Sequence, residues 1–376
     1  MKIVVAMSGG VDSSVAAYML KKAGNEVVGV HFNFVGCKEK VSAEQALSDA
    51  KKVAKLLDIE FLDYDFTNEF TDTVITPFVN AYKNGVTPNP CANCNPNMKF
   101  KSLLKVTKEL GADMMASGHY ANVEKIKYDS GIEKFCIRKS KNPNKDQSYM
   151  LYGLTQEQLS HLIFPISDMN KTEVREFAKE LNLIVADKKD SQDVCFIDGD
   201  YAEFIKEYDF GLDYKEKIAL GKLILSEVES KPYLKKGEFV DLKGNVLGYH
   251  NGIINYTIGQ RKGLNIAFGE RKFVLKINKD KNQVVLGSND DLMGRRFTLK
   301  NVVYSGIENE NDLTKEYYAK LRYRHDGTLC SIKEKQGDKL VCELRDDVRA
   351  ITPGQSAVFY DDKDRIMFGG IIEYEE

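Results

Sequence analysis

Hydrophobic and polar positions follow two rhythms along the first two hundred residues. Runs rich in β-branched residues, such as 2–7 (KIVVAM) and 26–32 (EVVGVHF), have the composition of buried strands. Residues 42–58 have a helical pattern, and 59–66 (IEFLDYDF) again have the strand pattern. Between the first two strands, apolar residues recur at the spacing of one helix face, at Val11, Val15, Ala16, Met19 and Leu20. The alternation continues to residues 112–120 and predicts a doubly wound parallel sheet with helices on both faces.

The pattern changes in the second half of the chain. After about residue 205 helix periodicity fades, and short apolar runs separated by glycine turns predict strands. From about residue 291 these runs recur at the spacing of a small β-barrel. We therefore expect three domains: an α/β catalytic domain at 1–205, a β-rich linker domain at 206–290 and a C-terminal β-barrel at 291–376.

Composition narrows the class of protein. The chain has 376 residues, 43% of them apolar and 29% charged, and no apolar run approaches the ~18 residues needed to cross a bilayer. The apolar run at the N-terminus ends at glycine without a signal-peptide cleavage site. We expect a cytoplasmic protein with no membrane partner. The net charge of −2 neither indicates nor excludes nucleic acid, because a local basic face is enough to bind phosphates.

The segment 8–14, SGGVDSS, joins the first predicted strand to the first predicted helix. Free backbone N–H groups and the helix dipole attract phosphate at such a helix N-terminus. The loop lacks the lysine and the spacing of the Walker loop, and it is not the G-x-G-x-x-G of dinucleotide enzymes. A glycine turn with a Ser or Asp helix cap is the plain alternative. Because the motif is complete and lies between strand and helix, we interpret it as an anion cradle.

Seven cysteines, an odd number at irregular spacing, do not suggest the disulfide framework of a secreted protein. Cys91 and Cys94 form a C-x-x-C pair within 89–100, NPCANCNPNMKF. Zinc is disfavoured because no second pair of ligands follows. A thioredoxin-like redox pair is also disfavoured, because the flanking prolines predict a rigid loop and not a helix start. The remaining interpretation is that Cys91 and Cys94 are reactive thiols.

Cys195 is the third cysteine with a suggestive neighbourhood. It follows Lys188 and Lys189, whose positive charge would favour the thiolate, the form that attacks. Taken alone, such a cysteine is more often a small buried hydrophobe than a nucleophile.

Together these segments resemble the tRNA-specific 2-thiouridylases, and SGGVDSS is similar to the pyrophosphate loop of the N-type ATP pyrophosphatase superfamily. The resemblance rests on eight motifs in family order: AMSGGVDSSVAA (6–17), TPNPCANCNPNMKF (87–100), ASGHYA (116–121), NKDQSYMLY (144–152), KDSQDVCFI (189–197), YTIGQRKGL (256–264), LRYR (321–324) and TPGQSAVFY (352–360). The family implies an adenine-nucleotide alpha-hydrolase-like α/β domain, a β-rich linker domain and a C-terminal β-barrel.

The resemblance implies sulfur insertion at the wobble uridine of tRNAs of the Lys, Glu and Gln type. In the family, ATP activates the C2 carbonyl oxygen as an adenylate and a cysteine persulfide delivers the sulfur, giving 2-thiouridine, AMP and pyrophosphate. The implied partners are tRNA and an external sulfur donor, either a sulfur-relay protein or a cysteine desulfurase. Mg²⁺ bound with ATP is implied near Asp12.

By position in these motifs, the resemblance also assigns roles to individual residues. It makes Cys195 the persulfide carrier and Cys94 the second catalytic cysteine, with a transient disulfide between them. ATP is placed at Ala6, Met7, Ser8, Gly9, Gly10, Val11, Asp12, Ser13, Phe32 and Gly118. The pocket for the target base is placed at Asn89, Pro90 and Cys91. Contacts with tRNA are placed at His119, Lys145, Asp146, Gln147, Arg322, Tyr323 and Gln355.

Cys91 departs from the family, in which several members carry Asp at this position. The thiol is therefore open to three interpretations: an inert packing group, a substitute acid or base, or a third sulfur. With Cys94 and Cys195 it would supply three thiolates to an iron–sulfur cluster, an alternative mechanism that we do not favour because such clusters usually use four cysteines. Cys37 lies in a stretch that is shorter than in many members, and we regard it as incidental.

Two other classes of function compete with the thiouridylase. Another enzyme with the same ATP loop, such as argininosuccinate synthetase, GMP synthetase or a different tRNA thiolase, would not need both Cys94 and Cys195. A non-catalytic RNA-binding protein with structural cysteines would not need the intact SGGVDSS loop. Both features therefore favour the thiouridylase.

Overall fold

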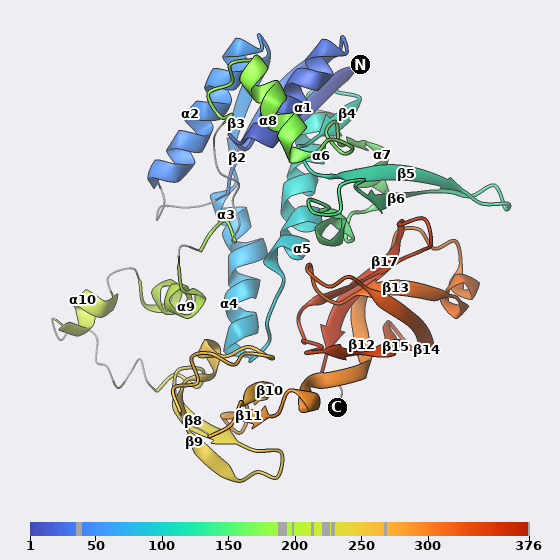
Figure 1. The fold of residues 1–376 in the computed structure, drawn as a ribbon. Coiled ribbons are helices and arrows are strands. Elements are labelled where there is room, and N and C mark those ends of the chain that lie inside the picture. The colour runs from blue at the N-terminus through green and yellow to red at the C-terminus, as the bar shows by residue number, and fades with distance from the viewer. Residues whose placement is uncertain are drawn as a thin grey trace.

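The computed structural model describes residues 1–34, 40–186, 194–197, 199–211, 214–219, 226, 230–266 and 269–374. The described chain forms three regions that follow one another along the sequence: a helix-covered parallel sheet, a small four-stranded sheet and a closed β-barrel (Figure 1). A two-stranded hairpin leaves the first region and lies beside the barrel (Figure 1). This order agrees with the fold class that we expected from the sequence.

The first region is built on five parallel strands in the order β3-β2-β1-β4-β7. Their bounds are β1 Lys2–Ala6, β2 Glu26–Asn33, β3 Glu60–Asp65, β4 Met114–Ala116 and β7 Leu162–Ile163. β1 pairs on one side with β2 and on the other with β4. Because the strands are parallel, their carboxyl ends meet at one edge of the sheet, the edge at which such domains bind ligands.

Helices cover both faces of this sheet (Figure 1). Across the described residues the helices are α1 Val11–Lys22, α2 Lys40–Leu56, α3 Thr67–Phe70, α4 Thr76–Lys83, α5 Pro90–Cys94, α6 Phe100–Glu109, α7 Gln156–Ser160, α8 Lys171–Glu180, α9 Tyr201–Phe210 and α10 Tyr214–Ala219, of which α9 and α10 lie away from this sheet (Figure 1). Shorter turns are η1 Thr71–Ile75, η2 Asn95–Lys99 and η3 Ser148–Leu151. Within the described ranges, no helix has both the length and the apolar composition needed to cross a membrane.

Strand β1 is buried on both sides because its side chains alternate between two hydrophobic clusters. Ile3 and Val5 point to one cluster, where Val15 of α1 packs with them. Val4 points to the other cluster, where Leu103 of α6 lies. None of these three β1 side chains has measurable solvent exposure. The central strand can therefore meet solvent or ligand only at its ends.

The second and third regions are β-rich. The small sheet has the order β10-β11-β8-β9, with β8 Lys236–Val240, β9 Val246–Asn251, β10 Phe273–Asn278 and β11 Gln283–Gly287. The closed barrel has the order β12-β15-β14-β13-β16-β17, with β12 Met293–Tyr304, β13 Glu316–Lys320, β14 Thr328–Gln336, β15 Lys339–Arg349, β16 Ser356–Tyr360 and β17 Ile366–Glu373. Short 3₁₀ turns are η4 Ile253–Asn255, η5 Asp290–Leu292 and η6 Glu310–Thr314.

The expectation that helices fade after about residue 205 was wrong, because α9 and α10 continue to residue 219. Asp200 caps α9, since its carboxylate accepts hydrogen bonds from the N–H groups of Ala202 and Glu203 at 2.9 and 3.0 Å. The helix buries Ala202 and Ile205 in a cluster shared with the second region. This tertiary burial stabilises a helix whose own apolar pattern is weak.

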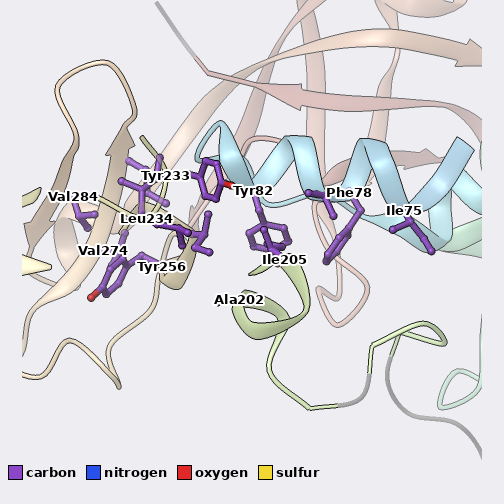
Figure 2. Packing of buried hydrophobic residues seen from close by; sticks show 14 of the residues in the cluster. Ile75, Phe78, Tyr82, Ala202, Ile205, Tyr233, Leu234, Tyr256, Val274 and Val284 are labelled. Atoms are coloured by element: carbon purple, nitrogen blue, oxygen red, sulfur yellow. The ribbon is translucent and has the colours of Figure 1, made fainter. Parts of the chain in front are cut away.

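Helix α4 joins the first region to the second. Ile75, Phe78 and Tyr82 are spaced three and four residues apart and lie along one face of this helical segment, pointing towards α9 and the small sheet (Figure 2). The partners on the other side of the cluster are Ala202, Ile205, Tyr233, Leu234, Tyr256, Val274 and Val284 (Figure 2). Phe196 belongs to the same cluster, and its ring centroid is 5.2 Å from that of Phe78. The cluster therefore fixes the position of Phe196, the residue that follows Cys195 in the chain.

The hairpin of β5 (Ala121–Lys127) and β6 (Glu133–Lys139) ties the first region to the barrel. Lys139 forms an ion pair with Asp364 at 2.6 Å, and the two residues also share a backbone hydrogen bond of 3.0 Å. Arg365 lies 3.5 Å from Glu124 of β5 and forms an isolated β-bridge with Arg138. Lys139 and Asp364 are 225 residues apart in the sequence, and Glu124 and Arg365 are 241 residues apart.

We expect Phe78→Ala to destabilise the region that contains α4 by about 3–5 kcal/mol, because Phe78 is buried and its removal leaves a cavity among aromatic rings. Chemical denaturation followed by tyrosine fluorescence measures this change. Tyr249→Ala, which removes an exposed ring of β9, is the control and should change the stability by less than about 1 kcal/mol. A similar loss in both variants would contradict the role of α4 as the link.

Candidate active site

The segment after β1 turns at two glycines and then becomes α1. Gly9 has a φ of +71°, and a Cβ added there would lie 2.2 Å from the carbonyl oxygen of Ala46 on α2, so only glycine fits. Gly10 is the N-cap, and the hydroxyls of Ser13 and Ser14 donate hydrogen bonds to its carbonyl at 3.1 and 2.8 Å. Gly10 has no side chain to cap the first turn. The helix N-terminus is therefore suited to an anion.

A second loop approaches this helix end from the neighbouring strand. Gly118 lies two residues after β4, and a Cβ added to it would lie 2.6 Å from both the Asp12 carbonyl carbon and the Ser13 nitrogen. The two backbones are thus in direct contact, and a side chain at Gly118 would separate them. Ser8 joins the same loop, because its N–H donates to the Ser13 hydroxyl at 3.2 Å.

The other residues assigned to ATP lie at the same edge of the sheet. Ala6 ends β1, and Met7 is buried with its N–H donating to the carbonyl of Val30 at 2.7 Å. Val11 starts α1 and is also buried. Phe32, near the end of β2, is half-buried, and its ring centroid lies 5.5 Å from that of Phe66 and 6.2 Å from that of Tyr64. The rings of Phe32, Tyr64 and Phe66 therefore form an aromatic group at the same edge of the sheet as the glycine loop.

Asp12, in the first turn of α1, has two partners that the sequence analysis did not identify. The Lys171 ammonium lies 2.8 Å from each of its carboxylate oxygens, and the Tyr120 hydroxyl donates to one of them at 2.6 Å. Tyr120 lies in the ASGHYA motif, which offered a signal for it. Lys171, 159 residues away from Asp12 along the chain, stands at the start of α8 and had no comparable signal.

The cysteine segment is helical, so the expectation of a rigid loop was wrong. Asn89 is the N-cap of α5, and its side-chain oxygen accepts a hydrogen bond from the Ala92 N–H at 3.2 Å. Pro90 occupies the first turn, a position where its missing N–H and fixed φ are favourable. The helix continues through the π-helical η2 into α6, and this wider turn accommodates Pro96, which lacks an N–H. Asn followed by Pro was the signal for this helix start.

The three cysteines of interest are free thiols. Cys91 and Cys195 are exposed, and Cys94 is half-buried against the cluster that contains Phe196. Cys94 and Cys91 are close enough to Cys195 to raise its pKa. The structure therefore brings near one another two thiols that lie 101 positions apart in the sequence, with Cys91 in the same neighbourhood.

At neutral pH the three cysteines are mostly protonated thiols, because the pKa of each is raised. Although Cys195 has an exposed edge, the protein atoms around it restrict its hydration, and this desolvation raises its pKa to about 11. The charge of Cys94 raises that pKa further, and the ammonium of Lys99 opposes the shift. Desolvation likewise raises the pKa of Cys91 and of Cys94. The expected activation of Cys195 by the lysines at 188 and 189 falls on positions outside the described residues.

Among the residues that the structure describes, no group of three or more His, Cys, Asp or Glu side chains has an arrangement that would hold a metal ion. The three thiols influence one another electrostatically, but they are not arranged as a ligand set in this structure.

The barrel reaches the cysteine helix through the loop before β16. The Gln355 side-chain amide donates to the carbonyl oxygens of Thr87 and Pro88, at 3.0 and 3.2 Å. Gly354 has a φ of +89°, and a Cβ there would lie 2.8 Å from the Thr87 carbonyl oxygen. The Tyr149 hydroxyl donates to the Ser356 carbonyl at 2.8 Å. Gln355, assigned to tRNA by the resemblance, therefore holds the segment that leads into α5.

The segment 145–147 has mixed surroundings. Asp146 is buried, and its carboxylate accepts hydrogen bonds from the N–H groups of Ser140 and Ser148 and from the Ser148 hydroxyl. This carboxylate stabilises its own loop, and a contact with RNA would require these bonds to break. Gln147 accepts a hydrogen bond from the Tyr120 N–H at 3.0 Å, and Lys145 is half-buried.

Three further residues assigned to tRNA contact other residues of the protein. Arg322 donates to the carbonyl of Arg349 at 2.8 Å. Tyr323 is 39% exposed, and its ring centroid lies 6.3 Å from that of the fully buried Tyr149, which places it near the cysteine helix. His119 is half-buried beside the rings of Phe100 and Phe164, and desolvation lowers its pKa well below the usual range, with the nearby Lys99 adding to the shift. It is therefore neutral at pH 7.

We expect alkylation of Cys195 by iodoacetamide to accelerate about tenfold per pH unit from pH 7 to 9.5 without a plateau. The thiolate is the reacting form, and a pKa of about 11 keeps its fraction small and proportional to hydroxide over this range. Mass spectrometry of the Cys195 peptide after timed quenching measures the rate. A plateau near pH 8.5, the behaviour of an ordinary thiol, would show that the desolvation described here is absent in solution.

We expect Gly118→Ala to weaken ATP binding at least tenfold, because the added methyl group would push the loop away from the backbone of Asp12 and Ser13. Isothermal titration of the nucleotide measures the affinity. Gly294→Ala is the control, since a Cβ there would meet only the Ile351 side chain, at an ordinary contact distance of 3.5 Å. Equal affinities in the wild type and the Gly118 variant would contradict the assignment of this loop.

Comparison with known families agrees with this architecture. Residues 1–199 match a model described as a tRNA methyl transferase HUP domain, residues 228–288 its PRC-barrel domain, and residues 294–372 an aminomethyltransferase beta-barrel domain. Among solved structures, the U34-tRNA thiolase NcsA from Methanococcus maripaludis with its [4Fe-4S] cluster aligns at 18% identity with a TM-score of 0.36, covering 61% of this chain and 73% of that one. At this score the alignment supports no statement about a cluster in this chain.

Curated relatives match over the full length. The tRNA-specific 2-thiouridylase MnmA of Lachnoclostridium phytofermentans is 42% identical over 380 residues, which cover 99% of each chain. The protein of the same name from Clostridioides difficile is 41% identical over 379 residues, covering 99% of this chain and 98% of that one. The glycine loop, the paired cysteines and this full-length identity lead to one conclusion: the chain belongs to the MnmA family of tRNA-specific 2-thiouridylases.

Proposed function

We propose that this enzyme thiolates the wobble uridine of tRNA by adenylating the C2 oxygen with ATP and delivering sulfur from a persulfide on Cys195. Its family makes it a tRNA-uridine 2-sulfurtransferase that uses ATP. The observation that carries the persulfide route is the proximity of Cys94 and Cys195, from separate segments: Cys94 packs on the cluster that contains Phe196, the residue after Cys195, and it raises the pKa of Cys195. The sulfur donor, a relay protein or a cysteine desulfurase, and a cytoplasmic location belong to the same proposal.

The glycine loop fits the phosphates of ATP. Neither Gly9 nor Gly118 leaves room for a side chain, so a ligand would meet backbone N–H groups at the start of α1. Phe32 and the aromatic rings beside it would provide an apolar surface for the adenine. Asp12 would help to hold Mg²⁺, a hard cation that prefers oxygen ligands. The cation would neutralise phosphate charge during adenylation.

The first turn of α5 would form the pocket for the uracil. A stacked base cannot expose its C2 atom, so the wobble uridine must turn out of the anticodon stack. Asn89, Pro90 and Cys91 would contact this base, with Cys94 one helical turn further on. Cys91 would occupy the position of the family's aspartate as a neutral thiol, because its pKa is raised by desolvation.

The bonds would change in the following order. The C2 oxygen of uracil attacks the α-phosphorus of ATP, pyrophosphate leaves with the bonding electrons, and the N3 proton passes to solvent. The terminal sulfur of the Cys195 persulfide then attacks C2, and AMP leaves with its oxygen. The Cys94 thiolate attacks the Cys195 sulfur, which frees the thiouridine sulfur and forms a Cys94–Cys195 disulfide. An external dithiol reduces this disulfide with two electrons.

The tRNA would lie across the barrel face nearest the cysteine helix. Tyr323 has an exposed ring near Tyr149, and single-stranded bases stack on such rings. Lys145, Gln147 and Arg322 would contact RNA in addition to their protein contacts. Gln355 would contact the RNA while its side-chain amide keeps its hydrogen bonds to the carbonyl oxygens of Thr87 and Pro88. Binding should weaken as salt rises, because phosphate contacts release counterions.

The test is anaerobic thiolation of a uridine-34 tRNA with ATP and a persulfide donor, comparing iron-free with cluster-reconstituted protein. We expect full activity without iron, and a loss of at least about 100-fold in both Cys195→Ser and Cys94→Ser. The Cys195 variant should still bind tRNA and release one equivalent of pyrophosphate, because adenylation precedes sulfur transfer, but it should not release AMP, which leaves only when sulfur attacks C2. Cys136→Ala, which changes a buried thiol of the hairpin, is the matched control.

Two results would overturn the persulfide proposal. Normal thiolation by Cys195→Ser would remove this residue as the sulfur carrier. Activity that appears only after cluster reconstitution would favour the alternative in which Cys91, Cys94 and Cys195 ligate an iron–sulfur cluster.

A further inference from the structure

The glycine loop has no lysine of its own, and the fold brings one to it from a distant helix. Loops of the Walker type carry a lysine that reaches the β- and γ-phosphates, but 8–14 (SGGVDSS) contains none. Lys171, the first residue of α8, extends to the first turn of α1 and contacts Asp12. Figure 1 shows α8 lying beside α1 at the edge of the sheet.

The contact is close and largely shielded from water. The Lys171 nitrogen lies 2.8 Å from each oxygen of Asp12, and the two side chains are only 14% and 29% exposed. Tyr120, in the loop that carries Gly118, donates to the same carboxylate at 2.6 Å. Three segments, from α1, α8 and the loop after β4, therefore meet at one carboxylate. A charge at this depth interacts strongly with a neighbouring phosphate because little water screens it.

The position of Lys171 is not explained by the stability of α8. The helix N-terminus carries the positive end of the helix dipole, where a lysine is unfavourable. Asn170 and Glu173 already form a complete capping box for this end. The apolar face of the helix packs on α1 through Val174 and Ala178, without help from the lysine. The lysine thus stands where it opposes the helix dipole and faces the phosphate loop.

We propose that Lys171 is a catalytic residue whose ammonium contacts the β-phosphate of ATP and stabilises the departing pyrophosphate. The inference rests on the proposed function, in which adenylation releases pyrophosphate. As the oxygen of uracil bonds to the α-phosphorus, the bond to the bridging oxygen breaks and its electron pair adds negative charge to pyrophosphate. The ammonium of Lys171 stabilises this charge. No proton or electron passes to or from Lys171, and the N3 proton of uracil goes to solvent.

Before ATP binds, the ammonium of Lys171 is paired with the carboxylate of Asp12. The paired charges cancel, so neither is left uncompensated in a site that excludes most water. When the phosphates enter, the ammonium has only to turn from a carboxylate to a phosphate oxygen a short distance away. Tyr120 continues to hold the carboxylate during this exchange.

The experiment compares Lys171→Gln and Lys171→Arg with Lys179→Gln, which makes the same charge change two turns further along the same helix. Isothermal titration measures the affinities for pyrophosphate, for AMP and for α,β-methylene-ATP, an analogue that resists cleavage between the α- and β-phosphates. The rate of tRNA-dependent AMP release, with the persulfide donor present, gives kcat and KM for ATP. Thermal unfolding checks that each variant is folded.

We expect Lys171→Gln to lower the affinity for pyrophosphate and for the analogue by about tenfold or more, with the affinity for AMP unchanged, because AMP has no β-phosphate. Its kcat for AMP release should fall by at least about 30-fold, and Lys171→Arg should recover part of this loss. Lys179→Gln should match the wild type. Unchanged affinity for pyrophosphate in a folded Lys171→Gln would overturn the proposal, as would an equal loss for AMP, which would indicate that the lysine only supports the loop.

The outcomes also separate this inference from the proposed function. Cys195→Ser is expected to release pyrophosphate in its first turnover at the wild-type rate, because it fails only at sulfur transfer. If wild type and Cys195→Ser both release pyrophosphate in the first turnover and Lys171→Gln does so equally well, the role of Lys171 is refuted and adenylation stands. If the wild type releases no AMP in the presence of tRNA, the proposed function fails, while the pyrophosphate affinities still decide whether Lys171 binds phosphate.

Discussion

The burial of β1 on both faces is the constraint on which the candidate site depends. With Ile3 and Val5 packed on one side, Val4 on the other and strands paired at both edges, the central strand can present chemistry only where it ends. At that end the next strand, β4, delivers its own loop so closely that Gly118 touches the backbone of α1. The phosphate loop is therefore shaped by backbone contacts that any side chain would disrupt, and its charge must come from elsewhere in the fold.

The cysteine helix is held by all three regions of the molecule. Its N-cap, Asn89, belongs to the first region, the aromatic cluster around Phe78 and Phe196 connects it with the second, and Gln355 of the barrel binds the two residues before it. A displacement of the barrel by RNA would therefore act directly on the segment that carries Cys94. Under the proposed function, this arrangement would couple RNA binding at the barrel to the helix that carries Cys94, through hydrogen bonds and packing.

Desolvation gives the thiols a restrained resting state. The raised pKa of Cys195, of Cys94 and of Cys91 keeps each sulfur protonated near neutral pH, and a protonated thiol is oxidised and alkylated slowly. A sulfur carrier exposed at the surface gains from this restraint, because reaction with solvent oxidants would consume it. The same shielding strengthens the attraction between any charge that enters the site and its counter-charge, such as the pair of Asp12 and Lys171.

The sequence by itself determined the α/β domain, the barrel and the family, because hydrophobic periodicity and the loop motif depend on residues adjacent in the chain. It also identified the glycine loop and the cysteines Cys94 and Cys195. It misjudged the start of α5, although Asn89 before Pro90 is a local cap signal, and it missed α10, whose helix is supported by tertiary packing. Only the tertiary structure decided that Lys171 meets Asp12, that Asp146 is buried and that desolvation raises the pKa of Cys195. Each of these depends on the positions of atoms from distant segments, and no local pattern records such distances.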